Sequence, residues 1–199
     1  MRPLTLPGTL TDAAGTVAVA WQVSPLVGPG GERTYAVSGV VRGVEMSGPG
    51  FEALGLVDCV ITATLPGLVT SDAGTVPERL VMRMTITRYV ECTVEVGGSS
   101  TGESDAGSPA SRTSLAEALA FLDAGRPGRY VRGCATCRLA GPAPGGPRVM
   151  GLACYRDAAA AYLVGSAAEG AAVPVTEVVP DFWWCDEYEG FRVGRPDSF

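Results

Sequence analysis

The chain has 199 residues, of which 46% are hydrophobic and 18% are charged, and its formal net charge is −6. This hydrophobic content is enough for a sizeable core and excludes a chain that is disordered throughout. An acidic protein gains nothing from neutralising phosphates, so we expect no nucleic-acid partner. All 15 basic residues are arginine, and the chain contains no histidine and no lysine. These absences exclude Ser-His and Cys-His dyads, imidazole metal ligands and lysine Schiff bases.

The first residues do not have the pattern of a targeting segment. Gly and Pro interrupt the stretch Met-Arg-Pro-Leu-Thr-Leu-Pro-Gly, which therefore lacks the apolar centre of a signal peptide. No stretch approaches the roughly 18 to 20 apolar residues of a membrane helix. We expect a cytoplasmic protein with no membrane partner. In the cytoplasm, the 6 cysteines of the chain are expected to be buried thiols, metal ligands or redox groups rather than disulfides.

Residues 15–97 have the pattern of short β-strands. Apolar and polar residues alternate along several runs, as in half-buried strands, and Gly- and Pro-rich turns separate the runs. Separate short strands of this kind favour an antiparallel sandwich or a curved sheet. The expected strands run over Gly15 to Val23, Thr34 to Val41, Val57 to Leu65 and Leu80 to Val96.

The hydrophobic period changes after residues 98–112, a Gly- and Ser-rich stretch that is typical of a loop or linker. Ser114 and Glu117 have the spacing of a capping box, which predicts the start of a short helix. We expect that helix to reach about Asp123 and to end at Gly125.

Residues 130–165 are expected to contain two short strands and a second helix. The strand-like runs are Tyr130 to Cys134 and Arg148 to Tyr155. The helix is expected over Ala158 to Val164, with Asp157 as its N-cap.

These elements predict an α+β protein. It would consist of an N-terminal antiparallel β-sheet or sandwich over residues 1–97, a loop or linker over 98–112, and a smaller α/β segment with a four-cysteine site over 113–199. The α/β segment is expected to pack on the β region, because neither part alone has an ample core.

Four of the six cysteines have a spacing that suits a shared site. Cys134 and Cys137 form a C-x-x-C pair, whose two-residue gap lets both thiolates point into one tetrahedral site from a tight turn. Cys154 follows a Gly- and Pro-rich stretch over 141–147 that is suited to folding the chain back, and Cys185 lies in the C-terminal segment. Four thiolates suit zinc, held in a closed structural site. The sequence therefore predicts a zinc ion bound by these four cysteines.

Two other interpretations of these cysteines stay open. Cysteine is among the most buried residue types, so all four could be ordinary core thiols without a metal. The other alternative is a redox pair or an iron–sulfur cluster. A thioredoxin-like pair needs a helix after its first cysteine, and the Leu-Ala-Gly-Pro that follows Arg138 would stop one. Cys59 and Cys92 lie within expected strands and are interpreted as small core residues.

A second set of polar residues could form a catalytic pocket. Residues 181–190 combine two tryptophans with four carboxylates, and Asp181 and Glu187 are the candidate acid and base. Arg42 and Glu45, close to a Gly- and Pro-rich turn, are further candidates for a site on a loop rim. The alternative is structural: a tryptophan anchors the tail to the core, the carboxylates are solvated, and Arg42 belongs to a surface ion pair.

Three stretches of the chain form a specific combination. They are Arg-Gly-Val-Glu-Met-Ser-Gly-Pro-Gly-Phe-Glu-Ala-Leu at 42–54, the C-x-x-C pair followed by Gly-Leu-Ala-Cys-Tyr-Arg at 151–156, and Trp-Cys-Asp-Glu-Tyr-Glu at 184–189. Together they resemble a family of uncharacterised bacterial, mainly actinobacterial, proteins catalogued as a domain of unknown function. The resemblance covers most of residues 35–190 and implies that the four cysteines act as a set. Members typically carry an aromatic residue inside the C-x-x-C pair and a polar, aromatic stretch after it, where this chain has Ala135 and the stretch Leu-Ala-Gly-Pro-Ala-Pro-Gly at 139–145. A function carried by that stretch in relatives would be lost or altered here.

Three functions are therefore open at this stage. The first is a binding or accessory protein with structural zinc, whose partner is an unknown protein or small molecule. The second is a small enzyme of natural-product metabolism that uses carboxylates and aromatic residues in a pocket. The third is a thiol redox protein. A closed cage of four thiolates has no open coordination position, which favours the first.

Overall fold

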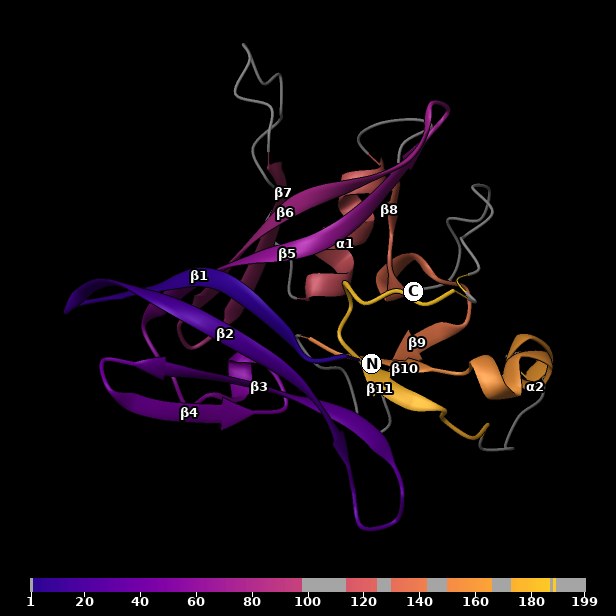
Figure 1. The fold of residues 1–199 in the computed structure, drawn as a ribbon, viewed down its shortest axis with the longest axis horizontal. Coiled ribbons are helices and arrows are strands. Elements are labelled where there is room, and N and C mark those ends of the chain that lie inside the picture. Colours follow the sequence, from indigo (N-terminus) through magenta and orange to yellow (C-terminus); the bar gives the residue numbers. More distant parts are fainter. Residues whose placement is uncertain are drawn as a thin grey trace.

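A computed structural model of the chain describes residues 2–97, 114–124, 130–142, 150–165, 173–186 and 188. The loop or linker expected over 98–112 lies outside these residues. The described part of the chain forms a large antiparallel sheet, a small three-stranded sheet and two helices (Figure 1). No helix within it is long and apolar enough to span a lipid bilayer.

The large sheet begins with a four-stranded meander. Its strands are β1 (Leu4–Asp12), β2 (Gly15–Val27), β3 (Arg33–Val41) and β4 (Val44–Gly48), each antiparallel to the one before. The strands expected from Gly15 and from Thr34 correspond to β2 and β3. The sequence pattern missed β1, because Pro7 and Gly8 in its middle are typical of a turn.

A second meander completes the large sheet. Its strands are β5 (Cys59–Ser71), β6 (Gly74–Ile86) and β7 (Val90–Gly97), so the single run expected over 80–96 is divided between β6 and β7. The first half of β5 pairs with β1, and its second half pairs with β8 (Tyr130–Arg132). The strand order is therefore β4-β3-β2-β1-β5-β6-β7, with β8 beside the far end of β5.

The small sheet lies beside this large one and carries the second helix. It consists of β9 (Ala140–Pro142), β10 (Leu152–Cys154) and β11 (Glu177–Val179), with β10 in the centre and both pairings antiparallel. Figure 1 shows α2 (Ala159–Gly165) at its outer end, and β11 passes close to β3. Thus the small sheet is placed against the first meander.

Both expected helices are present, but only one starts as expected. In α1 (Leu115–Ala124), the Glu117 N–H donates to the Ser114 Oγ at 3.2 Å, which confirms the predicted cap. The predicted cap of α2 is wrong. Asp157 lies inside a 3-10 turn, η3 (Arg156–Ala158), that leads into α2, and its own N–H donates to the Thr176 hydroxyl at 3.0 Å. The expected end of α1 at residue 125 lies outside the described residues.

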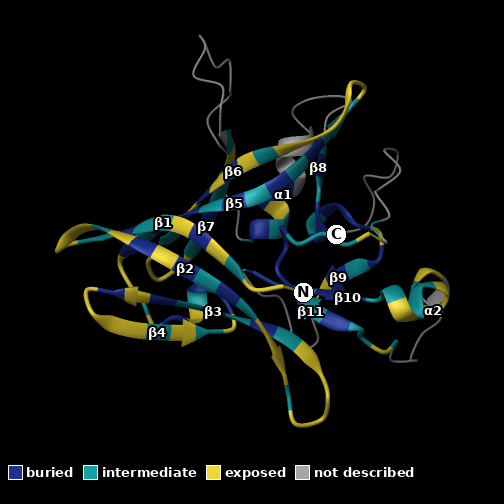
Figure 2. Cartoon of the chain, viewed as in Figure 1, coloured by how far each residue is buried: buried dark blue, intermediate teal, exposed yellow. Residues whose placement is uncertain are grey.

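The main core lies on one face of the large sheet. Figure 2 shows buried positions alternating with more exposed ones along its strands. At the centre, the Trp21 and Phe51 rings pack edge to face with their centroids 5.3 Å apart. Met150 and Phe182, from the C-terminal half of the chain, belong to the same cluster. The C-terminal half is therefore packed directly on the sheet.

The predicted α+β class is wrong, because the described part of the chain is a β-rich fold. Its two helices have only 10 and 7 residues. The segment expected as an α/β unit over 113–199 instead contributes β8 to the large sheet and all three strands of the small one, in which the central β10 is antiparallel to β9 and to β11. Helical periodicity was present locally, but the pairing partners of short strands are set by contacts distant in sequence, which no local pattern shows.

Gly8 lies at the contact between β1 and β5, and its lack of a side chain is required there. A Cβ would overlap the Thr62 carbonyl oxygen and lie 3.0 Å from the Trp21 ring. We expect Gly8→Ala to lower the free energy of urea unfolding by about 1–3 kcal/mol, the usual cost of overpacking. Thr11→Ala, on the same strand as Gly8, is the control, and it removes an exposed hydroxyl contact with Thr16 of β2. It is expected to cost less than about 0.5 kcal/mol, and equal effects of the two changes would contradict the packing.

Candidate metal centre

The C-x-x-C segment is a tight turn between two strands. β8 leads through Gly133 into the 3-10 turn η2 (Cys134–Thr136), and the chain then continues to β9. The Thr136 hydroxyl accepts the Gly133 N–H at 3.3 Å and donates to a carbonyl of β8. The Cys137 N–H donates to the Cys134 carbonyl at 3.2 Å. Its own hydrogen bonds therefore fix the turn that carries the first two cysteines.

Cys154 reaches the same place through the small sheet. It is the last residue of β10, where it lies opposite Ala140 of β9 and Glu177 of β11. Ala140 follows Cys137 by three residues, and its N–H donates to the Cys137 carbonyl at 3.1 Å. The pairing of β9 with β10 therefore brings Cys154 beside the C-x-x-C turn.

Cys185 is brought in by the C-terminal segment, which lies along the same turn. The Cys134 N–H donates to the Trp183 carbonyl at 2.6 Å, and the N–H of the next residue donates to the Asp181 carbonyl at 2.9 Å. The two segments approach closely because Gly133 has no side chain: a Cβ there would lie 3.2 Å from the Asp181 oxygen. These contacts place Cys185, two residues after Trp183, next to the turn.

The structure thus brings the four predicted cysteines together. Cys134 and Cys137 are each 7% exposed and Cys154 is 6% exposed, whereas Cys185 is half-buried. Cys134 and Cys154 form a small cluster with Val179, separate from the core of the large sheet. Four thiols from three separate stretches of the chain therefore share one small, mostly buried region.

The other three site cysteines lie close enough to Cys134 to affect its protonation. Burial is the largest cause that raises the pKa of Cys134 well above its ordinary value of 9.0, and charge on Cys154, Cys137 and Cys185 raises it further. Burial also raises the pKa of Cys154, although a hydrogen bond from the Arg156 backbone N–H and the Arg156 charge oppose the rise. Several thiolates at this place therefore need a cation to balance their charge.

The donor set fits a thiolate metal site, but the side chains are not arranged as a closed cage. All six cysteines of the chain are free thiols. As placed, the described residues contain no group of three or more Cys, Asp or Glu side chains that could hold a metal ion. A cage with Zn–S distances of about 2.3 Å therefore requires the sulfur atoms to lie closer together than they do here.

Tyr188, which the sequence analysis did not select, holds the C-terminal segment against the turn. Its hydroxyl lies 3.0 Å from the Thr136 hydroxyl and donates to the Thr136 carbonyl at 3.3 Å. The Arg132 guanidinium lies over the Tyr188 ring, 4.9 Å from its centroid. No sequence pattern indicates this role, because it exists only once the C-terminal segment lies beside the turn.

Asp181, one of the catalytic candidates, is a buried residue that joins two segments. Only 1% of it is exposed, and its Oδ2 accepts the Gly151 N–H at 2.7 Å. Nearby, the Tyr35 hydroxyl donates to the Met150 carbonyl at 3.1 Å. Burial raises the pKa of Asp181 to about 7. The carboxyl group therefore connects the segment that leads to Cys185 with the start of β10.

Arg42, another catalytic candidate, belongs to a surface ion pair. It lies at the turn between β3 and β4, where its Nη1 and Nη2 contact the two Asp12 carboxylate oxygens at 2.6 and 2.8 Å. The hydrogen bond from Arg42 lowers the pKa of Asp12. This pair joins the β1–β2 turn to the β3–β4 turn. Both turns lie at the end of the first meander that is away from the small sheet (Figure 1).

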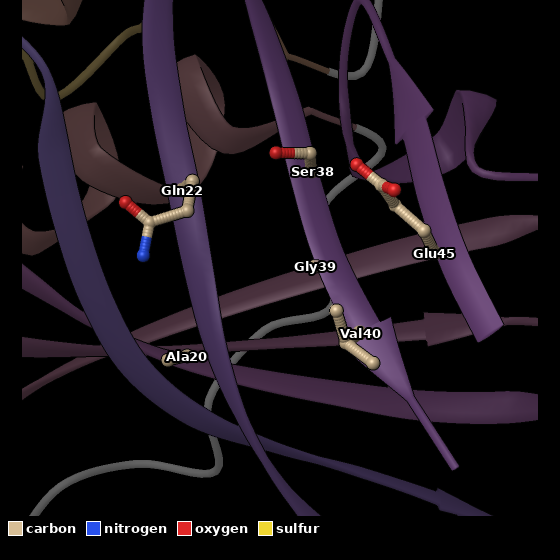
Figure 3. Close-up of a pocket in the computed structure, with 6 residues that line it drawn as sticks. All are labelled: Ala20, Gln22, Ser38, Gly39, Val40 and Glu45. Carbon is tan, nitrogen blue, oxygen red and sulfur yellow. The ribbon is translucent and has the colours of Figure 1, made fainter. Parts of the chain in front are cut away.

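Glu45 lies on the exposed face of the first meander. Together with Gln22 and Ser38 it lines a shallow depression of about 410 Å³ over β2, β3 and β4 (Figure 3). Asp181 is buried on the core side, and Glu187 lies outside the described residues. The described candidates for an acid and base therefore do not share a pocket.

Cys59 and Cys92 are core residues of the large sheet, which confirms their interpretation from the sequence. They are 4% and 0% exposed. Burial raises the pKa of Cys59 and raises that of Cys92 to about 12. Both are therefore neutral thiols that pack as small apolar side chains.

Comparison of the chain with known protein families, with curated proteins and with solved structures gives no match. The family resemblance of the three sequence stretches therefore stays a prediction. The candidate site is supported by the arrangement of residues described above.

The buried Asp181 carboxyl predicts a pH-dependent stability with a definite sign. Its pKa is about 7 in the folded protein against an ordinary value of 3.8, so between these values the folded state holds a proton that the unfolded chain has released. The free energy of unfolding should therefore fall as the pH rises from about 4 to about 7, by up to roughly 4 kcal/mol. Asp181→Asn still offers an acceptor to Gly151 and cannot ionise. We expect this variant to lose the slope and to exceed the native protein in stability above pH ~7.

Urea unfolding at about pH 5 and about pH 8 measures this difference. Asp12→Asn is the control, because Arg42 lowers the pKa of Asp12. The exposed Arg42–Asp12 pair stabilises the folded protein above the ordinary pKa of Asp12, and this stabilisation is lost as the pH falls through the lowered pKa. For this pair the free energy of unfolding therefore rises with pH, which is opposite to the effect of Asp181. A native stability that rises between these two pH values, or an unchanged slope in Asp181→Asn, would contradict the role of the buried carboxyl.

Proposed function

We propose that Cys134, Cys137, Cys154 and Cys185 bind one zinc ion that stabilises the C-terminal half of the protein. The observation that supports this proposal is the convergence of the four thiols. A turn, a strand end and a C-terminal segment deliver them to one place, each through backbone hydrogen bonds. Four sulfur donors and a chain without histidine suit zinc in a closed tetrahedral site.

A cluster of thiols without a metal explains this arrangement less well. In the large sheet, Cys59 and Cys92 lie among apolar side chains, as metal-free core cysteines do. At the candidate site, charge on three neighbouring thiols raises the pKa of Cys134, and the charge of Arg156 acts on Cys154. A bound cation would attract these thiolates and offset the repulsion between them, because thiols that coordinate a metal are deprotonated.

A thioredoxin-like redox pair also fits the geometry less well. Such a pair needs the first cysteine at the start of a helix, which lowers its pKa. Here the first cysteine begins η2, a 3-10 turn of three residues that ends in extended backbone at Cys137. Burial and the neighbouring thiols raise the pKa of Cys134. Both observations favour a structural site over a reactive dithiol.

We infer that the protein acts as a binding or accessory protein rather than as a zinc enzyme. Four thiolates leave no coordination position for a substrate, and the partner would be another protein or a small molecule. A cytoplasmic location is consistent with six free thiols. The alternative of a small enzyme of natural-product metabolism has less support, since Arg42 is occupied by Asp12 and Asp181 is buried away from Glu45.

Elemental analysis of protein purified without chelator tests the zinc site. We expect about one zinc per chain, and its removal should lower the free energy of unfolding by several kcal/mol. Cys185→Ser and Cys154→Ser are each expected to lose most of the zinc, because a hydroxyl is a poor replacement for a thiolate. Cys185 is half-buried, so its variant is the one expected to stay folded.

Cys92→Ser is the matched control, with the same chemical change at a buried cysteine of the main core. It should cost about 1–3 kcal/mol of stability while the zinc content stays unchanged. A native protein without zinc, or full retention of zinc in both site variants, would overturn the proposal. Iron with visible absorption in place of zinc would point to a cluster instead.

A further inference from the structure

The outer face of the first meander carries a depression that contains three polar side chains. Residues of β2, β3 and β4 line this space of about 410 Å³: Ala20, Gln22, Ser38, Gly39, Val40 and Glu45. Figure 3 shows the Glu45 carboxylate leaning toward β3 and the Ser38 hydroxyl pointing toward β2. Three polar groups from three neighbouring strands therefore border one common space.

The protein core supports the floor of this depression from below. A Cβ on Gly39 would lie 2.7 Å from the Trp21 ring, so the backbone of β3 rests directly on that ring. Trp21 is fully buried, its Nε1 donates to the Thr62 carbonyl at 3.2 Å, and its ring packs edge to face on Phe51. The strands that carry the polar groups are therefore held in place before a ligand arrives, which lowers the cost of binding.

The polar side chains of the depression have hydrogen-bonding capacity that the protein does not use. The Thr5 hydroxyl donates to the Gln22 Oε1 at 2.9 Å, which orients the amide and leaves its NH2 group as a donor. The Ser38 hydroxyl can donate or accept, and the Glu45 carboxylate accepts. Among the residues that the structure describes, neither Ser38 nor Glu45 has a side-chain hydrogen bond or an ion pair.

The charge and the apolar surface of the depression indicate the class of ligand. Glu45 supplies the charge of its lining, and the nearby Arg42 is paired with Asp12, so a cation is attracted and an anion is repelled. Val40, which is 58% exposed, and the exposed Ala20 offer an apolar surface beside the polar groups. β2 and β4 are two strand spacings apart, or about 10 Å. A small ring with an ammonium group, hydroxyl groups and an apolar face matches these features.

We propose that this depression binds a small hydroxylated ammonium compound of the size of a single amino-sugar ring. The Glu45 carboxylate pairs with the ammonium group, the Gln22 amide donates to a ligand oxygen, and the Ser38 hydroxyl bonds to a ligand hydroxyl. The carbon face of the ring lies on Val40. Because the depression is shallow and open, we expect a Kd of about 1–10 mM. Binding at this place does not require the proposed zinc site.

Titration of nitrogen-15-labelled protein with D-glucosamine, followed by two-dimensional NMR, tests the proposal. At about pH 6 a carboxylate is ionised and an amine carries its proton. We expect saturable shifts of the backbone amide signals of residues 20–22, 38–40 and 45. Glucose has a hydroxyl group in place of the amine, so it should bind at least about 10-fold more weakly, because the charge-assisted hydrogen bond to Glu45 is lost.

Variants of the lining residues separate a built site from attraction by net charge. Glu45→Gln keeps the size of the side chain and removes its charge, so we expect glucosamine to bind it at least about 10-fold more weakly. Gln22→Met removes the amide donor and should weaken binding about 3- to 10-fold. Glu91→Gln is the matched control. Glu91 is exposed on β7, at the opposite edge of the large sheet, so the same loss of charge there should leave binding unchanged.

Saturable shifts that are confined to the depression and are lost in Glu45→Gln would support the proposal. Shifts spread over the acidic surface, or equal binding to Glu45→Gln and Glu91→Gln, would show attraction by net charge only and would overturn it. A titration that does not saturate by about 100 mM glucosamine, or glucose that binds as tightly as glucosamine, would also overturn it. Each of these outcomes is independent of the zinc content of the protein.

Discussion

The contact between the C-x-x-C turn and residues 181–183 is the constraint on which the cysteine site depends. In this contact the carbonyls of Asp181 and Trp183 accept N–H groups from the turn, and the lack of a side chain at Gly133 leaves room for the close approach. The Asp181 carboxyl extends the same contact to Gly151, at the start of the strand that ends in Cys154. One short segment therefore touches both of the other stretches that carry cysteines.

The large sheet provides the base on which this contact is built. Phe182, between the two carbonyls that accept from the turn, is buried in the core of the sheet, and so is Met150 beside Gly151. By contrast, the cluster formed by Cys134, Cys154 and Val179 is small and buries little apolar area of its own. A metal ion is an established way to stabilise a part of a protein whose own core is small. The acidic and aromatic residues around residue 181 therefore have a clear structural role, in positioning the thiols.

Local patterns in the sequence predicted the local structure, and contacts distant in sequence account for what they missed. Strict alternation indicated most strands of the large sheet, and the Ser114–Glu117 spacing predicted the start of α1. The partner of β8 is β5, far earlier in the chain, so no window of sequence could show that the C-terminal half completes a β-rich fold. The cysteines could be grouped because their chemistry is distinctive. Tyr188 could not be selected in this way, because its contacts with Thr136 and Arg132 exist only once the C-terminal segment lies beside the turn.

The central claim is that four sulfur atoms, and no other ligand, hold one zinc ion in this protein. X-ray absorption at the zinc K edge tests it most directly, since the spectrum reports the type, number and distance of the ligands in the native protein. We expect a single shell of four sulfur atoms at about 2.3 Å. A shell containing nitrogen or oxygen at about 2.0–2.1 Å, or a native protein that holds no zinc to measure, would contradict the claim.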